Sequence, residues 1–147
     1  MQMIEKDRIS RIDSRRIIFF FIFIFMFLFT EFGREVYRPY IYSNGIFDFW
    51  IADTIGNFTG TITIIFFEMV IINPEYKKGK IFLYVIVFGL IIYELIQYLI
   101  PKNIGDWRDI VATLLAGLIA LGLYELIFRK HKIKILYKLP MNEKKAD

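Results

Sequence analysis

Residues 81–128 read IFLYVIVFGLIIYELIQYLIPKNIGDWRDIVATLLAGLIALGLYELIF. Two apolar runs, 81–100 and 107–128, are separated by a short segment that contains Pro101 and Gly105. Each run is close to the roughly 20 residues that an α-helix needs to cross the hydrocarbon core of a bilayer. Because Pro and Gly are typical of turns, this stretch predicts a hairpin of two antiparallel membrane-spanning helices.

Two further apolar runs precede this hairpin, at about 17–32 and 49–72. The first follows Arg15-Arg16, as in a secretory signal, but it lacks a small-residue cleavage site, so we interpret it as an uncleaved span. The sequence therefore predicts an all-α fold, an integral membrane bundle of four transmembrane helices over 17–128. A cytoplasmic segment, 1–16, would precede it, and a basic cytoplasmic tail, 129–147, would follow.

The composition agrees with a membrane protein. The chain has 147 residues, of which 56% are hydrophobic, and its mean hydropathy is +0.48, whereas soluble domains are about 45–50% apolar. Cysteine is absent, which excludes disulfides and cysteine nucleophiles, and the one histidine, His131, lies in the basic tail. We therefore expect no metal site and no cofactor, and we attribute the net charge of +4 to topology rather than to nucleic-acid binding.

The distribution of Lys and Arg predicts the orientation. Fifteen of these residues lie in the two terminal segments and the 73–80 loop, and four lie in the other two connections. Cytoplasmic loops carry the excess of positive charge, so both termini are expected in the cytoplasm. Trp50 and Trp107 then both fall at the outer interface, which tryptophan prefers. The expected location is a bacterial cytoplasmic membrane.

Polar residues inside the spans indicate a candidate site, because intramembrane carboxylates are costly. Helical spacing places them in pairs on single faces, and the topology places all the pairs at one depth in the outer half of the membrane. The predicted pocket consists of Asp53, Asn57, Glu94, Gln97, Asp106, Arg108, Asp109 and Thr113. Its acids would share a proton, pair with Arg108 or a first-loop arginine, or hold a metal ion.

A structural interpretation competes with this one. Asp53 and Asp109 lie near the beginnings of their helices, where a carboxylate caps the helix or favours its dipole. Glu94 lies near a helix C-terminus, where the dipole disfavours an anion. We therefore expect Glu94 to point into the bundle toward a specific partner.

Small residues beside these polar ones predict where helices pack. Gly56 and Gly60 form a small-xxx-small pair in the second span, and Ala112, Ala116 and Ala120 form a stripe in the fourth. The threonines at 59, 61 and 63 are interpreted as structural, since their hydroxyls can bond to their own helix backbone.

The motif Glu94-x-x-Gln97, followed by a turn, Asp106-x-x-Asp109 and Gly117, resembles the VanZ-like family of small bacterial membrane proteins. The family has E-x-x-Q, a turn with Arg, D-x-x-D, an Asn four residues later, and Gly. Here Lys102 stands near the turn Arg and Thr113 replaces the Asn. An earlier family element, D-K-x-x-H, corresponds to Asp53–Asn57 at the same spacing, with Thr54 and Asn57 replacing the Lys and His. The resemblance covers about residues 47–128 and implies a link to glycopeptide (teicoplanin) resistance.

Three functions stay open from the sequence. The first is a non-enzymatic envelope protein whose outer pocket binds membrane lipids, such as the headgroup of an envelope glycolipid or peptidoglycan precursor. The second is a membrane enzyme that acts on such a headgroup, with Glu94 or Asp109 as general acid or base. The third is an oligomeric proton or cation transporter subunit that uses Glu94. We favour the first, because the chain lacks the usual nucleophile–base or His–metal sets.

The orientation can be tested with reporter fusions. A reporter fused after Lys145 should be cytoplasmic, and one inserted between Arg38 and Asn44 should be external, because the positive-inside rule assigns these sides. Activity of a periplasmic reporter such as alkaline phosphatase at each site provides the measurement. An external C-terminus would overturn the shared-depth argument.

Overall fold

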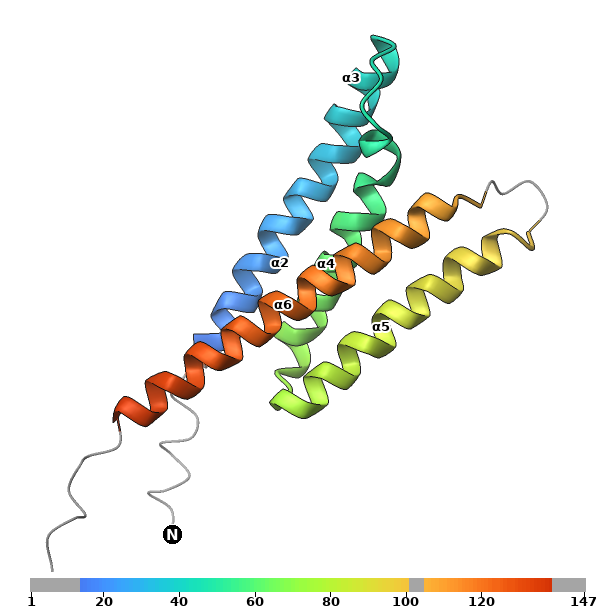
Figure 1. Ribbon diagram of the computed structural model, residues 1–147. Coiled ribbons are helices and arrows are strands. Elements are labelled where there is room, and N and C mark those ends of the chain that lie inside the picture. Colours follow the sequence, from blue (N-terminus) through green and yellow to red (C-terminus); the bar gives the residue numbers. More distant parts are fainter. Residues whose placement is uncertain (1–13, 101–104, 139–147) are drawn as a thin grey trace, which may run out of the picture.

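Four antiparallel helices form the bundle. The computed structural model describes residues 14–100 and 105–138, with side chains as far as Arg129. Four helices are long and apolar enough to cross a membrane, Ser14–Ser43, Ile51–Ile72, Tyr76–Gln97 and Trp107–Arg129, which confirms the predicted all-α membrane fold. The first helix begins and the last one ends at the same end of the bundle (Figure 1). The side of the membrane on which this end lies stays a prediction.

The first helix is longer than the predicted 17–32. It comprises α2 (Ser14–Phe32), the π-helical turn η1 (Gly33–Tyr37) and α3 (Arg38–Ser43), which together form 30 continuous residues. Such a helix is about 45 Å long, against a hydrocarbon core of about 30 Å. Pro39 follows the π turn, in which the Arg38 N–H donates to the Gly33 carbonyl five residues back. The chain thus stays helical beyond the apolar run, where its sequence becomes polar.

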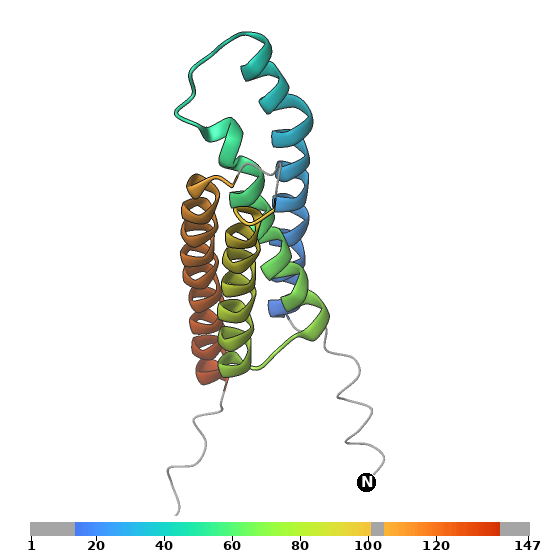
Figure 2. The same cartoon turned by 90° about the vertical axis from the view of Figure 1, so that its right-hand side faces the viewer.

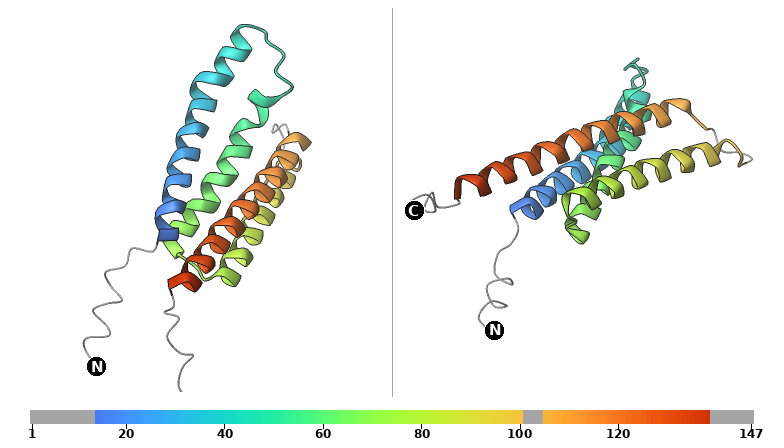
Figure 3. Two further views of the ribbon diagram at one scale, coloured as in Figure 1. Left: turned by 60° about the vertical axis from the view of Figure 1, so that its left-hand side comes forward. Right: turned by 60° about the horizontal axis from the view of Figure 1, so that its bottom comes forward.

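The other helices are α4 (Ile51–Ile72), α5 (Tyr76–Gln97) and α6 (Trp107–Lys138). α5 begins just after the Asn73-Pro74 turn. The lysines that were predicted to lie in the 73–80 loop therefore belong to the first turns of α5. α6 continues past residue 128 into the predicted tail. The rest of that tail, and residues 1–13 of the predicted N-terminal segment, lie outside the described residues. α5 and α6 run side by side in Figures 1 and 2, and Figure 3 shows α2 beside α4.

An aromatic and aliphatic core fills the end of the bundle where α2 begins. Phe19, Phe66 and Tyr124 are each fully buried there. The Phe19 ring stacks on the Tyr124 ring at 6.0 Å and packs against Phe66 at 5.8 Å. The Tyr124 hydroxyl donates to the Tyr76 carbonyl at 3.0 Å, which satisfies its polar group. This end therefore carries most of the apolar packing.

Polar side chains at the same end pair with each other. The Glu125 carboxylate lies 2.6 Å from Lys80 Nζ and accepts a hydrogen bond of 2.5 Å from the Tyr76 hydroxyl. Glu125 on α6 is thus joined to the first two turns of α5. These interactions fix the relative height of the two helices at this end.

Small residues allow α6 to approach its neighbours closely. Ala112, Ala116 and Ala120 are all buried, as predicted, and the last two belong to the core. A Cβ placed on Gly117 would lie 2.7 Å from Val87 Cγ2, so α5 packs directly against this glycine. Gly33 likewise faces Ile55 at 3.1 Å, where the first helix meets α4.

The predicted packing role of Gly56 and Gly60 is wrong. A Cβ added at either position would meet no described atom of another element within 4 Å. The side of α4 that contacts the first helix instead carries Thr59, which is 1% exposed. Small residues lower the cost of close helix approach, but they do not by themselves decide which face of a helix meets a neighbour.

A threonine cluster joins the first helix to α4. The Thr30 hydroxyl donates to Thr59 Oγ1 at 2.8 Å and lies 3.4 Å from Thr63 Oγ1. Each of the three hydroxyls also contacts a carbonyl four residues earlier in its own helix. The threonines of α4 are therefore structural, as predicted, and two of them also bond to the neighbouring helix.

Replacing Thr59 by Val should destabilise the protein, whereas replacing Gly60 by Ala should not. Thr59→Val removes an interhelical hydrogen bond, worth about 0.6 and at most about 1.7 kcal/mol in membrane proteins. Gly60→Ala adds a methyl group in open space and improves helix propensity by up to about 1 kcal/mol. Unfolding free energies in mixed micelles provide the measurement. A larger loss for Gly60→Ala would restore the glycine contact.

Candidate functional site

The candidate site lies at the end of the bundle opposite the aromatic core. Three chain segments meet there: the first two turns of α4, the last turn of α5 and the first turn of α6. They supply, respectively, Asp53 with Asn57, Glu94 with Gln97, and Asp106 to Asp109. Because the helices alternate in direction, residues distant in sequence arrive at the same height (Figure 1).

Glu94 is the most enclosed acid of the site. It is only 7% exposed, and its Oε2 accepts a hydrogen bond of 2.9 Å from Gln97 Nε2. The carboxylate also lies within electrostatic range of Asp109 on α6. The predicted interior position of Glu94 and its contact with Gln97 are therefore confirmed, whereas among the described side chains no hydrogen bond or ion pair joins its carboxylate to α4 or α6.

Asp109 connects the three helices electrostatically. Its carboxylate lies within electrostatic range of Glu94 on α5, of Asn57 and Asp53 on α4, of Asp106 one turn earlier, and of the cation Arg38 on the first helix. Thr113, one turn further along α6, is 2% exposed. The structure thus places the predicted acids and amides of α4, α5 and α6 at the same end of the bundle, within electrostatic range of Asp109.

Two other aspartates cap the helices. The Ala52 N–H donates to Asp48 Oδ2 at 2.7 Å, and the Arg108 N–H donates to Asp106 Oδ1 at 2.9 Å. These bonds satisfy N–H groups that the first turns of α4 and α6 leave free. The side-chain caps are therefore Asp48 and Asp106, whereas Asp53 and Asp109 lie in the first turns of α4 and α6, where the predicted favourable interaction with the helix dipole holds. Asp48 was absent from the predicted site, although an Asp shortly before a helix is a recognisable capping signal.

Asp53 faces the end of the first helix. Its Oδ1 accepts a hydrogen bond from the Tyr42 hydroxyl, which in turn accepts one of 3.2 Å from Arg38 Nε. A second tyrosine of the same helix, Tyr37, donates to Asp48 at 3.1 Å. Two tyrosines therefore hold the long first helix against the beginning of α4, a connection that the sequence did not reveal.

Arg108 does not pair with Glu94. Its Nη1 lies 3.6 Å from Asp106 Oδ2, and its guanidinium lies over the Trp50 ring, 4.3 Å from the centroid. Its Nε is buried and has no hydrogen-bond partner. Of the alternatives predicted for the acids, pairing with Arg108 is therefore found at Asp106, and within the described ranges no ion pair joins Glu94 to an arginine.

The acids of the site do not form a metal centre. Among the described side chains, no group of three or more His, Cys, Asp or Glu is arranged so that it could hold a metal ion. The carboxylates are instead spread over three helices and are engaged by amide, hydroxyl and guanidinium groups. Such a set can accept hydrogen bonds from amines and hydroxyls.

Comparisons with known proteins identified no relative of this chain. No family model, no curated protein and no solved structure matches this chain.

Glu94→Gln should leave the unfolding free energy within about 0.5 kcal/mol of the wild-type value. The neutral isostere keeps the contact with Gln97, and no described arginine depends on the carboxylate. Unfolding in mixed micelles measures the change, with Glu68→Gln at the other end of α4 as the matched control. A loss of about 3–5 kcal/mol would show that a buried cation has lost its partner.

Proposed function

We propose that this protein is a non-enzymatic, multi-pass protein of a bacterial cytoplasmic membrane that binds the polar headgroup of a lipid or envelope glycolipid. The binding pocket is the set of acids and amides between α4, α5 and α6. The excess of Lys and Arg in the terminal segments favours the outer leaflet for this end of the bundle.

The burial of Glu94 beside Asp109 carries this proposal. An acid placed at 7% exposure in a membrane span is expensive and marks a functional site by default. Gln97 donates one hydrogen bond to it, and Asp109 adds a second negative charge rather than a compensating positive one. A ligand that brings hydrogen-bond donors, such as a headgroup amine or sugar hydroxyls, would complete this environment.

The VanZ-like resemblance supports the same proposal. Its two best-matching motifs, Glu94-x-x-Gln97 and Asp106-x-x-Asp109, come from different helices and contribute neighbouring side chains to the pocket. A ligand class in keeping with that resemblance is an envelope glycolipid or a peptidoglycan precursor. A role in glycopeptide resistance would follow if such a precursor is the ligand.

Native mass spectrometry tests the proposal. The wild-type protein, released from micelles doped with phosphatidylethanolamine or with a diglycosyl lipid, should retain one of them. Glu94→Gln and Asp109→Asn should each weaken retention about tenfold, because hydrogen bonds to charged groups contribute about 1.5–3 kcal/mol.

Glu68→Gln is the control for this measurement, since Glu68 lies at the opposite end of α4. It removes the same charge and should leave retention unchanged. Equal retention by the wild type and both site variants would refute headgroup binding at this pocket.

A further inference from the structure

A groove opens at the same end of the bundle as the acidic pocket. It has a volume of about 450 Å³ and lies between α4 and α6, with Phe29 of the first helix at its edge. The walls are formed largely by Ile55, Phe58, Val111 and Leu115. Pockets of this size, with apolar walls, are typical of sites for small apolar ligands.

The threonine hydroxyls of the groove wall already donate hydrogen bonds to their own helix. The Thr54 hydroxyl donates to the Trp50 carbonyl at 3.0 Å, and the Thr59 hydroxyl donates to the Ile55 carbonyl at 2.6 Å. The interior of the groove therefore presents methyl groups and rings. A hydrocarbon chain is the ligand chemistry that such a wall fits.

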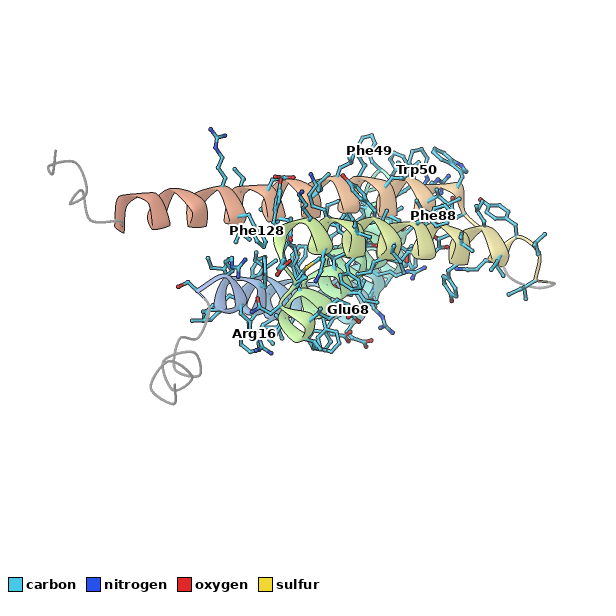
Figure 4. All side chains as sticks on the ribbon, turned by 90° about the horizontal axis from the view of Figure 1, so that it is seen from below. Arg16, Phe49, Trp50, Glu68, Phe88 and Phe128 are labelled. Carbon is cyan, nitrogen blue, oxygen red and sulfur yellow. The ribbon has the colours of Figure 1, made fainter. Side chains whose placement is uncertain are left out.

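The mouth of the groove carries aromatic rings and one cation. Trp50, Trp107 and Arg108 all line it, and Figure 4 shows Phe49 and Trp50 together beside the first turns of α6. Phe49 and Trp50 hold left-handed backbone conformations, with φ of 57° and 65°, which bulky residues rarely adopt. Tryptophan prefers the headgroup level of a membrane, and the guanidinium group of arginine binds phosphate.

The cation that lines this mouth has an acid next to it, Asp106, which does not itself line the groove. The guanidinium of Arg108 has a buried Nε without a partner and only a long contact, 3.6 Å, with Asp106. Asp106 in turn lies beside Asp109, on the acidic side of α6. A headgroup with a phosphate next to a primary ammonium matches this adjacent pair of charges, whereas a purely anionic headgroup would face the acids.

We infer that the groove binds an aminophospholipid: one acyl chain lies between α4 and α6, the phosphate contacts Arg108, and the primary ammonium faces Asp106. This assignment rests on the proposed function, because it names the lipid class that occupies the same end of the bundle. It uses residues other than Glu94 and Asp109, so it can fail while headgroup binding at the acidic pocket stands.

The two tryptophans make the inference directly measurable. They are the only ones in the chain, and both line the groove. The full-length protein is reconstituted into phosphatidylcholine vesicles that contain a small fraction of lipid with brominated acyl chains, which quench tryptophan on contact. Brominated phosphatidylethanolamine should quench more strongly than brominated phosphatidylglycerol or phosphatidylcholine.

Variants that remove one charge distinguish the contact with the phosphate from the contact with the ammonium group. Arg108→Gln should weaken enrichment of both phosphatidylethanolamine and phosphatidylglycerol about fivefold, the effect of one surface charge on an ionic headgroup. Asp106→Asn keeps the helix cap, because Asn caps as well as Asp. It should abolish the preference for phosphatidylethanolamine over phosphatidylglycerol. Arg34→Gln, an exposed arginine of the first helix, is the control and should change neither.

A pair of filling variants tests the chain site. Val111→Phe with Leu115→Phe narrows the groove and should reduce quenching by every brominated lipid. Leu114→Phe with Leu118→Phe likewise adds two phenyl rings, at exposed positions of α6 outside the groove lining, and should have no effect.

Three results would overturn the inference: equal quenching by the three lipids, stronger quenching by phosphatidylglycerol, or unchanged quenching in the filled groove. If Glu94→Gln abolished the quenching by brominated phosphatidylethanolamine while Arg108→Gln left it unchanged, lipid binding would be confined to the acidic pocket, and the inference would fail.

Discussion

Lipid offers polar groups no hydrogen bonds, and this constraint determines the arrangement of the bundle. Every carboxyl, amide or hydroxyl group in a span must find a partner in the protein or reach the interface. Thr30 meets Thr59 between the first helix and α4, and Glu94 meets Gln97 inside the bundle. The rotation of each helix about its own axis follows from these contacts as much as from apolar packing.

The two ends of the bundle consequently differ. At the end where α2 begins, Phe19, Phe66 and Tyr124 fill the space between the helices. At the opposite end, acids and amides take the place of such rings, and the groove between α4 and α6 leaves apolar wall uncovered by protein. Close packing at one end supports a less stable, polar arrangement at the other, which is typical of proteins that hold a binding site at the end of a rigid scaffold.

Much of the fold could be predicted from the sequence, because span length and apolar content are properties of single segments. The shared height of Glu94 and Asp109 followed from helix direction alone. The direction in which Gly56 and Gly60 face could not be predicted, since a small residue is as stable against lipid as against a neighbouring helix. The full length of the first helix and the caps Asp48 and Asp106 were missed, because both depend on interfacial residues that hydropathy treats as loop.

The register of α5 against α6 is the central claim, since it places Glu94 beside Asp109. A Cβ on Gly117 would lie 3.5 Å from Val87 Cβ, within the range of about 3.5–4.5 Å found in disulfides. The chain has no native cysteine, so cross-linking of Val87→Cys with Gly117→Cys in membranes is unambiguous. The account predicts rapid disulfide formation in this pair and none for Val85→Cys with Gly117→Cys, because Val85 is exposed on another face of α5. Preferential cross-linking of the Val85 pair would contradict the register and, with it, the assembly of the site.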